Sequence, residues 1–149
     1  MIAVIQRVLK AKVEIEGRVS GEIDRGILVL LGVEKDDGIE EAEYCARKTA
    51  ELRIFPDDEH KMNLSLLDID GEALVVSQFT LPAKIAKGRR PSFDNAMPGK
   101  LAEDLYLSYV EELRKLSIKT ETGEFGAMMN VSLVNDGPVT FILESRNKA

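Results

Sequence analysis

The sequence contains few side chains suited to conventional acid–base or nucleophilic catalysis. It has one histidine, His60, in the charged stretch PDDEHKMN, and one cysteine, Cys45, in AEYCARK. We expect His60 to be a solvated surface residue and Cys45 to be a small buried residue of a helix. These two side chains cannot form a zinc site alone, and no spacing of carboxylates matches a metal loop. The glycines match no phosphate-binding loop, so the sequence predicts no metal and no cofactor.

The stretch VVSQFTL, residues 75–81, holds the hydroxyl groups best placed for chemistry. An acyl nucleophile at Ser77 or Thr80 needs a general base, and the sequence offers no obvious one. The plain alternative is a half-buried strand whose hydroxyl groups make local hydrogen bonds. Alternation along such a strand predicts two faces, one with Val76, Gln78 and Thr80, the other with Val75, Ser77, Phe79 and Leu81.

The stretch VNDGPVT, residues 134–140, lies between two apolar, β-branched segments near the C-terminus. Its Asn, Asp, Gly and Pro residues are common turn formers, which favours a loop that joins two strands. A Gly-Pro pair also permits an unusual backbone shape that can be presented to a ligand. The residues alone leave both interpretations open.

Length and charge restrict the classes of protein that fit. The chain has 149 residues, which predicts a single domain over residues 1–149. Its net charge of −6 argues against a general nucleic-acid binder, whose surface is usually basic. A local basic segment nevertheless occurs at residues 82–92, PAKIAKGRRPS, where no acidic residue is present. Its four cations are Lys84, Lys87, Arg89 and Arg90.

Membrane and export signals are not evident. The longest apolar run, ILVLLGV at residues 27–33, suits a buried strand and is far shorter than the ~20 residues of a membrane span. The N-terminal stretch MIAVIQRVLK alternates like a strand and does not resemble a signal peptide. A single cysteine excludes an intrachain disulfide and fits a reducing compartment. We therefore expect a cytoplasmic protein with no membrane partner.

Periodicity predicts an α+β fold that is rich in strands and has two main helices. One helix is expected over residues 38–52, with Ile39, Ala42, Ala46, Thr49 and Ala50 on its buried face. The second is expected from Pro98 to Leu116, burying Ala102, Leu105, Tyr109, Leu113 and Leu116. Residues 53–72 are expected to be irregular. Strands are expected at 2–8, 12–16, 72–81, 117–122, 127–135 and 138–145, with a short one after a hairpin loop within 16–23 and a central, doubly covered one at 26–33.

Taken together, SQFTL at residues 77–81 and NDGPVT at residues 135–140 resemble the signature pair of the D-aminoacyl-tRNA deacylase family. Further matches are IAVIQRV with Arg7, GILVLLGV, LRIFPD at 52–57 and KGRRPSF at 87–93, so the resemblance extends over essentially the whole chain. One departure is Pro82, where the family pattern leads us to expect a smaller residue such as alanine. This departure concerns the path of the following basic loop more than the chemistry.

The resemblance implies hydrolysis of the ester that joins a D-amino acid to the terminal ribose of a tRNA, and of glycine wrongly placed on tRNA. It implies a small barrel or curved sheet carrying helices, assembled as a homodimer. A cis Gly137-Pro138 bond would then reach from one subunit into the active site of the other as a chirality filter. The remaining roles that it implies are a catalytic pocket wall at Ser77, Gln78, Phe79 and Thr80, support of the filter by Arg7, Asn135 and Thr140, and contact with the tRNA acceptor end by Lys84, Lys87, Arg89 and Arg90.

The lack of an evident base leads to a hypothesis of substrate-assisted hydrolysis. Backbone N–H groups near Phe79 and Thr80 would stabilise the oxyanion, and the substrate's own ribose hydroxyl would help to position water. Thr80 as a covalent nucleophile is the competing form. Carbonyl groups at Gly137 and Pro138 would leave no room for an L side chain, although glycine would still enter.

The residues leave two other classes of function open. One is a non-catalytic module that binds an RNA end or a small ligand in the same pocket. The other is a general Ser/Thr esterase, which would cleave simple esters that lack a ribose.

Overall fold

A 14-residue strand, β1 (Ile2–Ile15), runs through the centre of the computed structural model, which describes residues 1–147. The first half of β1 pairs antiparallel with β3 (Gly26–Gly32), and its second half pairs with β2 (Arg18–Ile23). Along its other edge β1 pairs with β8 (Asn130–Glu144) over nearly its whole length. On its other side β3 pairs parallel with β6 (Glu72–Ser77), and β6 in turn pairs parallel with β7 (Thr120–Thr122).

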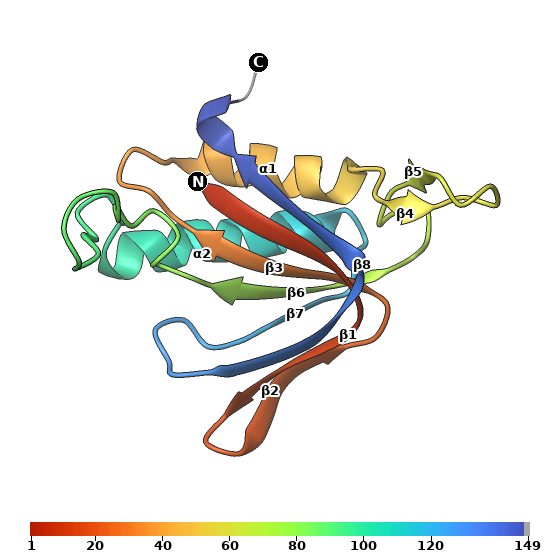
Figure 1. Ribbon diagram of the computed structural model, residues 1–149, viewed down its shortest axis with the longest axis horizontal. Helices are drawn as coiled ribbons and strands as arrows, with labels where there is room; N and C mark the ends of the chain where they lie inside the picture. Colours follow the sequence, from red (N-terminus) through yellow and green to blue (C-terminus); the bar gives the residue numbers. More distant parts are fainter. Residues whose placement is uncertain (148–149) are drawn as a thin grey trace.

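The sheet curls until its far strands approach each other. The Ser20 hydroxyl on β2 donates to the carbonyl oxygen of Thr122 on β7 at 3.2 Å, so the sheet is nearly closed into a barrel (Figure 1). A small hairpin of β4 (Phe55–Pro56) and β5 (Met62–Leu64) lies apart from this sheet, and a 3₁₀ turn, η1 (Ser145–Asn147), follows β8. The predicted α+β fold with a curved, barrel-like sheet and two main helices is confirmed.

The two helices, α1 (Ile39–Glu51) and α2 (Gly99–Lys115), pack over the sheet and bury the larger of two hydrophobic cores. The smaller core fills the inside of the curved sheet. Two buried tyrosines of α2 are satisfied by hydrogen bonds: Tyr109 donates to the Thr49 hydroxyl at 2.8 Å and Tyr106 to the Val75 carbonyl at 2.7 Å. Burial raises the pKa of both phenols, so both stay neutral donors.

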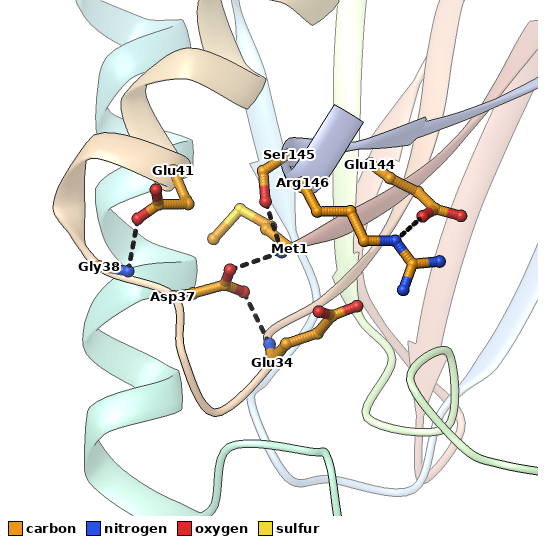
Figure 2. Close-up of polar contacts among 8 residues, drawn as sticks. All are labelled: Met1, Glu34, Asp37, Gly38, Glu41, Glu144, Ser145 and Arg146. Carbon is orange, nitrogen blue, oxygen red and sulfur yellow. Dashed lines mark hydrogen bonds and ion pairs between the residues drawn. The ribbon is translucent and has the colours of Figure 1, made fainter. Parts of the chain in front are cut away.

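The start of β1 is tied to both neighbouring chain segments (Figure 2). The fully buried ammonium group of Met1 lies 2.6 Å from Asp37 Oδ1 and 2.7 Å from the Ser145 hydroxyl. The Glu41 carboxylate accepts the Gly38 N–H at 2.8 Å, which satisfies a backbone donor at the beginning of α1. One cluster of polar contacts therefore joins β1, the loop before α1, and η1.

Several strand boundaries differ from the predictions because pairing, rather than local composition, decides them. Residues 2–8 and 12–16 belong to the single strand β1, since partners on both sides hold the backbone extended between them. The expected strands at 127–135 and 138–145 are likewise one strand, β8. The expected strand at 72–81 ends at Ser77, so residues 78–81 form a turn and the predicted alternation of their faces was wrong.

The helix faces were mostly predicted correctly. Ile39 is an exception: it is 52% exposed and faces a groove between the helices that Leu107 also lines. Tyr106 and Val110 are buried, although the prediction omitted them. Cys45 is buried and His60 is exposed, as predicted. None of the helices in the described part of the chain has the length and apolar character needed to cross a membrane.

Candidate active site

A pocket of about 450 Å³ opens at the C-terminal end of β6. Three segments that are distant in the sequence form it: the end of β6 with the turn after it, the beginning of α2, and the loop between β7 and β8. Ligands commonly bind at the carboxyl ends of parallel strands, and β6 is parallel to both of its neighbours. The lining residues are Val76, Ser77, Gln78, Phe79, Met97, Pro98, Gly99, Phe125, Gly126, Ala127, Met128, Met129 and Val131.

The turn after β6 leaves two neighbouring backbone donors without an acceptor. The Gln78 N–H donates to Leu31 O at 2.8 Å, and the Leu81 N–H donates to Gln78 O at 3.2 Å. The central residues, Phe79 and Thr80, are exposed, and within residues 1–147 their N–H groups make no hydrogen bond. Unpaired backbone donors side by side at a pocket can stabilise a developing oxyanion.

The side chains of the turn lack acid–base partners. The Gln78 amide donates to the Thr80 hydroxyl at 2.6 Å, which leaves that hydroxyl free to donate elsewhere. Among the described residues, no histidine, carboxylate or amine makes a hydrogen bond with Thr80 or Ser77. The geometry therefore provides two N–H donors but no general base from the chain itself.

The Gly-Pro segment forms a wide bulge in β8. Gln6 pairs with Thr140 and Val8 pairs with Asn135, so residues 136–139 stand opposite Arg7 alone. The peptide bond between Gly137 and Pro138 is cis, and Gly137 has φ of 148°. Both residues are exposed, so the bulge is presented to the surroundings while β8 continues on either side.

Side chains from both strands brace this bulge. The Asn135 amide donates to the carbonyl oxygens of Val139 at 2.9 Å and Arg7 at 3.1 Å, and accepts the Val139 N–H at 3.0 Å. Arg7 is 9% exposed and donates to Asp136 O at 3.1 Å and Ile54 O at 2.7 Å. Its Nε also lies 3.3 Å from the Asp136 carboxylate.

Two of the three residues expected to support the Gly-Pro pair contact each other, because the Asn135 amide donates to the Arg7 carbonyl oxygen. Thr140 follows the bulge, pairs with Gln6, and its exposed hydroxyl accepts a hydrogen bond from the Gln6 amide at 3.3 Å. The guanidinium of Arg7 holds the backbone at Asp136, the residue before Gly137.

The bulge and the pocket lie at opposite ends of the same sheet. Arg7 pairs with Ile27 at one end of β3, whereas Ser77 pairs with Leu31 at the other. Four residues along a strand correspond to about 13 Å at roughly 3.3 Å per residue. In Figure 1 the bend of β8 beside its label lies across the sheet from the arrowhead of β6. Within one chain, Gly137 and Pro138 thus do not line the pocket.

The basic loop follows the turn directly. Lys84 and Ser92 close it with two reciprocal backbone hydrogen bonds of 2.9 Å. All four predicted cations, Lys84, Lys87, Arg89 and Arg90, are exposed. Pro82, the one departure from the family pattern, is buried against Gly32 of β3. A Cβ at Gly32 would lie 3.0 Å from the proline ring, so the absence of a side chain there leaves room for Pro82.

The sequence did not reveal the methionine-rich part of the pocket wall. Met97, Met128 and Met129 come from separate segments, and Met128 is 92% exposed. The run AMMN was expected to lie in a strand, but residues 127–129 precede β8 and form the pocket edge. Methionine side chains are flexible and polarizable, so this edge can adapt to an apolar or aromatic ligand.

Comparison with known proteins identifies the family. The sequence model of the D-Tyr-tRNA(Tyr) deacylase family matches residues 4–144. The chain belongs to this family. A D-aminoacyl-tRNA deacylase of Thermosipho africanus is 58% identical over 98% of each chain. One of Geotalea uraniireducens is 59% identical over 99% of this chain and 96% of its own.

Two solved structures have a similar fold over nearly the whole chain. A protein described as c-Myc DNA Unwinding Element Binding Protein is 44% identical, with a TM-score of 0.90 over 97% of this chain and 98% of its own. A probable eukaryotic D-amino acid tRNA deacylase has a TM-score of 0.79 over 95% of this chain and 97% of its own. The second is 17% identical and shows similarity of fold alone.

Proposed function

We propose that this protein hydrolyses the ester of D-aminoacyl-tRNA to free amino acid and tRNA, and acts on mischarged glycyl-tRNA as well. The observation that carries the proposal is the turn at residues 78–81, whose two unpaired N–H groups lie beside a pocket lined by no acid–base side chain. Phe79 is in the pocket wall, and Thr80 follows it directly in the turn. Membership of the D-Tyr-tRNA(Tyr) deacylase family supports the same substrate. The cytoplasm is the proposed compartment, because charged tRNA is used there.

The proposed chemistry relies on the main chain and the substrate. Attack of water on the ester carbon develops a negative charge on the carbonyl oxygen, which the N–H groups of Phe79 and Thr80 would bind. One such donor contributes roughly 2.7–4 kcal/mol to transition-state stabilisation, or about 10²–10³ in rate. Because an aminoacyl ester is already activated, two donors and a neighbouring ribose hydroxyl suffice without a catalytic histidine.

The proposed selectivity requires a second copy of the chain. The bulge is exposed and lies across the sheet from its own pocket, so it can complete only the pocket of a partner subunit. Apolar side chains around it support such a homodimer, since Leu9 is 53% and Val134 40% exposed. In the completed site the carbonyls at Gly137 and Pro138 would occupy the space needed by an L side chain. A D side chain would point to solvent, and glycine would enter freely.

The basic loop is the proposed contact for the tRNA acceptor end. Its exposed lysines and arginines can neutralise phosphates beside the pocket, whereas the chain as a whole carries a net charge of −6. A small basic patch on an acidic protein fits the end of a tRNA better than a long contact with its body.

The direct test uses D-tyrosyl-, glycyl- and L-tyrosyl-tRNA with substoichiometric protein and a chelator. We expect multiple turnovers on the D and glycyl substrates and none on the L substrate. Binding without release of amino acid would favour the non-catalytic module. Comparable cleavage of L-tyrosyl-tRNA would rule out steric exclusion, and cleavage of simple esters without a ribose would favour the general esterase.

A second test separates the two mechanisms. Thr80→Val keeps the shape of the side chain and the backbone N–H but removes the hydroxyl. Main-chain catalysis predicts that deacylation of D-tyrosyl-tRNA stays within about tenfold of the unmodified protein, which corresponds to about 1.4 kcal/mol. A covalent role for Thr80 predicts that the variant no longer turns over the substrate. Deacylation within about tenfold of the unmodified protein would therefore exclude that role.

A further inference from the structure

We propose that Phe79 and Phe93 form a stacking platform for the unpaired nucleobase that precedes the terminal nucleotide of the tRNA. The inference rests on the proposed function and extends it with a second nucleotide subsite. Single-stranded RNA is commonly bound by stacking of its bases on exposed aromatic side chains next to cationic groups. Both features occur together beside the pocket.

The two rings form an exposed aromatic pair. Their centroids are 5.2 Å apart and their planes are inclined by 55°, although the residues are 14 positions apart in the sequence. Phe79 is 59% and Phe93 42% exposed, so each ring keeps a large free surface. Exposed rings that contact each other at a pocket provide apolar area that a planar base can cover.

The pair lies where a strand of RNA would leave the pocket. Phe79 lines the pocket, whereas Phe93 packs against Phe79 outside it. The segment between the two rings is the basic loop with its four exposed cations. If the terminal nucleoside with its ester occupies the pocket, the next base meets the aromatic pair and its phosphate meets the cations.

Backbone contacts hold Phe93 in this position. The Ser92 N–H and carbonyl pair with Lys84, and the Ala96 N–H donates to Phe93 O at 3.0 Å. The ring therefore stands at the base of a closed loop and not at its tip. Ile85 provides a comparison in the same loop, because it is 73% exposed but is not aromatic and is not part of the ring pair.

The experiment compares two substrates in the same variants: D-tyrosyl-tRNA, and 3′-O-D-tyrosyl-adenosine, which has no preceding nucleotide. For Phe93→Ala and Phe93→Leu we expect KM for the tRNA to rise by roughly five- to hundredfold, the range for loss of one stacked base. Cleavage of the adenosine ester should stay within about twofold. Phe93→Trp should retain the unmodified KM, and Ile85→Ala should behave like the unmodified protein.

Equal losses on both substrates, or no loss on either, would overturn the platform. A changed oligomeric state of Phe93→Ala in light scattering would overturn it as well, because the pair would then belong to a subunit contact. Binding of the trinucleotide CCA and of adenosine, measured directly, separates this inference from the proposed function. Lack of hydrolysis by the unmodified protein contradicts the proposed function and not the platform. Equal binding of CCA by Phe93→Ala and the unmodified protein contradicts the platform and not the proposed function.

Discussion

The bulge at residues 136–139 and the turn at residues 78–81 are both short interruptions at a strand, yet they are built in opposite ways. The bulge is enclosed by side-chain hydrogen bonds from Asn135 and Arg7 and by paired strand on both sides. The turn is closed by one backbone bond and leaves two N–H groups unpaired. In the proposed enzyme the braced segment rejects the wrong substrate, and the unsatisfied segment performs the chemistry.

The difference follows from what each task requires. Steric rejection works only if the rejecting atoms do not yield, so their backbone must be fixed by surrounding groups. Oxyanion stabilisation needs donors that are fixed in direction but not already bonded. Three predictions test this contrast and a fourth concerns the adjoining basic loop; the largest expected effect comes first.

Gly137→Ala should break the braced segment. A Cβ at this position would lie 2.6 Å from a methyl group of Val139 and 2.7 Å from its backbone N, and φ of 148° is unfavourable for an L residue. The bulge must therefore shift. Because displacement of about 1 Å can cost about 10²-fold in rate, we expect hydrolysis of D-tyrosyl-tRNA to fall roughly 100-fold.

Gly17→Ala is the matched control for Gly137→Ala. Gly17, in the β1–β2 hairpin, also has positive φ, 78°, but no atom lies within 4 Å of the position that a Cβ would take there. The variant should lose about 1 kcal/mol of stability and keep its activity. Equal activity losses in the two variants would mean that backbone strain, and not the position of the bulge, causes the effect.

Arg7→Met should destabilise the bulge by removing the buried guanidinium that holds its backbone. It removes the buried donors to Ile54 O and Asp136 O and leaves these carbonyls without their charged partner. We expect the free energy of unfolding in urea to fall by roughly 1.5–3 kcal/mol. Arg7→Lys should recover only part of this loss, since an ammonium cannot reproduce the two-directional geometry of the guanidinium. Full recovery by lysine would show that charge alone matters.

Asn135→Ala should have a smaller effect on stability, about 1–2 kcal/mol, because neutral hydrogen bonds are lost. Its informative readout is selectivity: a loosened bulge should admit L-tyrosyl-tRNA, so the ratio of D to L cleavage should fall. Thr80→Val also removes a neutral hydrogen bond, but at the turn, and should leave this ratio unchanged. A drop in the ratio for both variants would contradict the division of tasks.

Arg89→Ala with Arg90→Ala should have the smallest effect. Both side chains are exposed, so stability should be unchanged, while KM for D-tyrosyl-tRNA should rise several-fold at moderate salt. The slope of log affinity against log salt concentration should decrease by about 1.4 in magnitude, as expected for two lost phosphate contacts on single-stranded RNA. An unchanged slope would show that tRNA binds elsewhere.

Sequence patterns predicted the elements whose character is local. The helix expected at 38–52 is α1 at Ile39–Glu51, and the apolar run at 26–33 is the central strand β3. Pairing between distant segments was not predictable in this way. The continuity of β8 through a Gly-Pro pair depends on its pairing with β1 on both sides, which no window of residues around Pro138 can indicate.

The same limit applies to the candidate site. Resemblance to a family pointed to Arg7, Asn135 and the Gly-Pro pair, but their contacts join positions about 130 residues apart. The methionines of the pocket come from segments that meet only in the folded chain. In the sequence, Phe93 was notable only as the last residue of KGRRPSF, a stretch that resembles the family. Its contact with Phe79 was not predictable, because it depends on how the basic loop closes.

The paired flanks of the bulge also restrict its length. β8 is held in register with β1 at Thr140 on one side and at Asn135 on the other. An added or deleted residue between them would either move one flank by a single position and exchange its inward and outward side chains, or change the size of the bulge and so the position of Gly137 and Pro138. In related chains, insertions and deletions should therefore be far rarer in this segment than in the β1–β2 or basic loops.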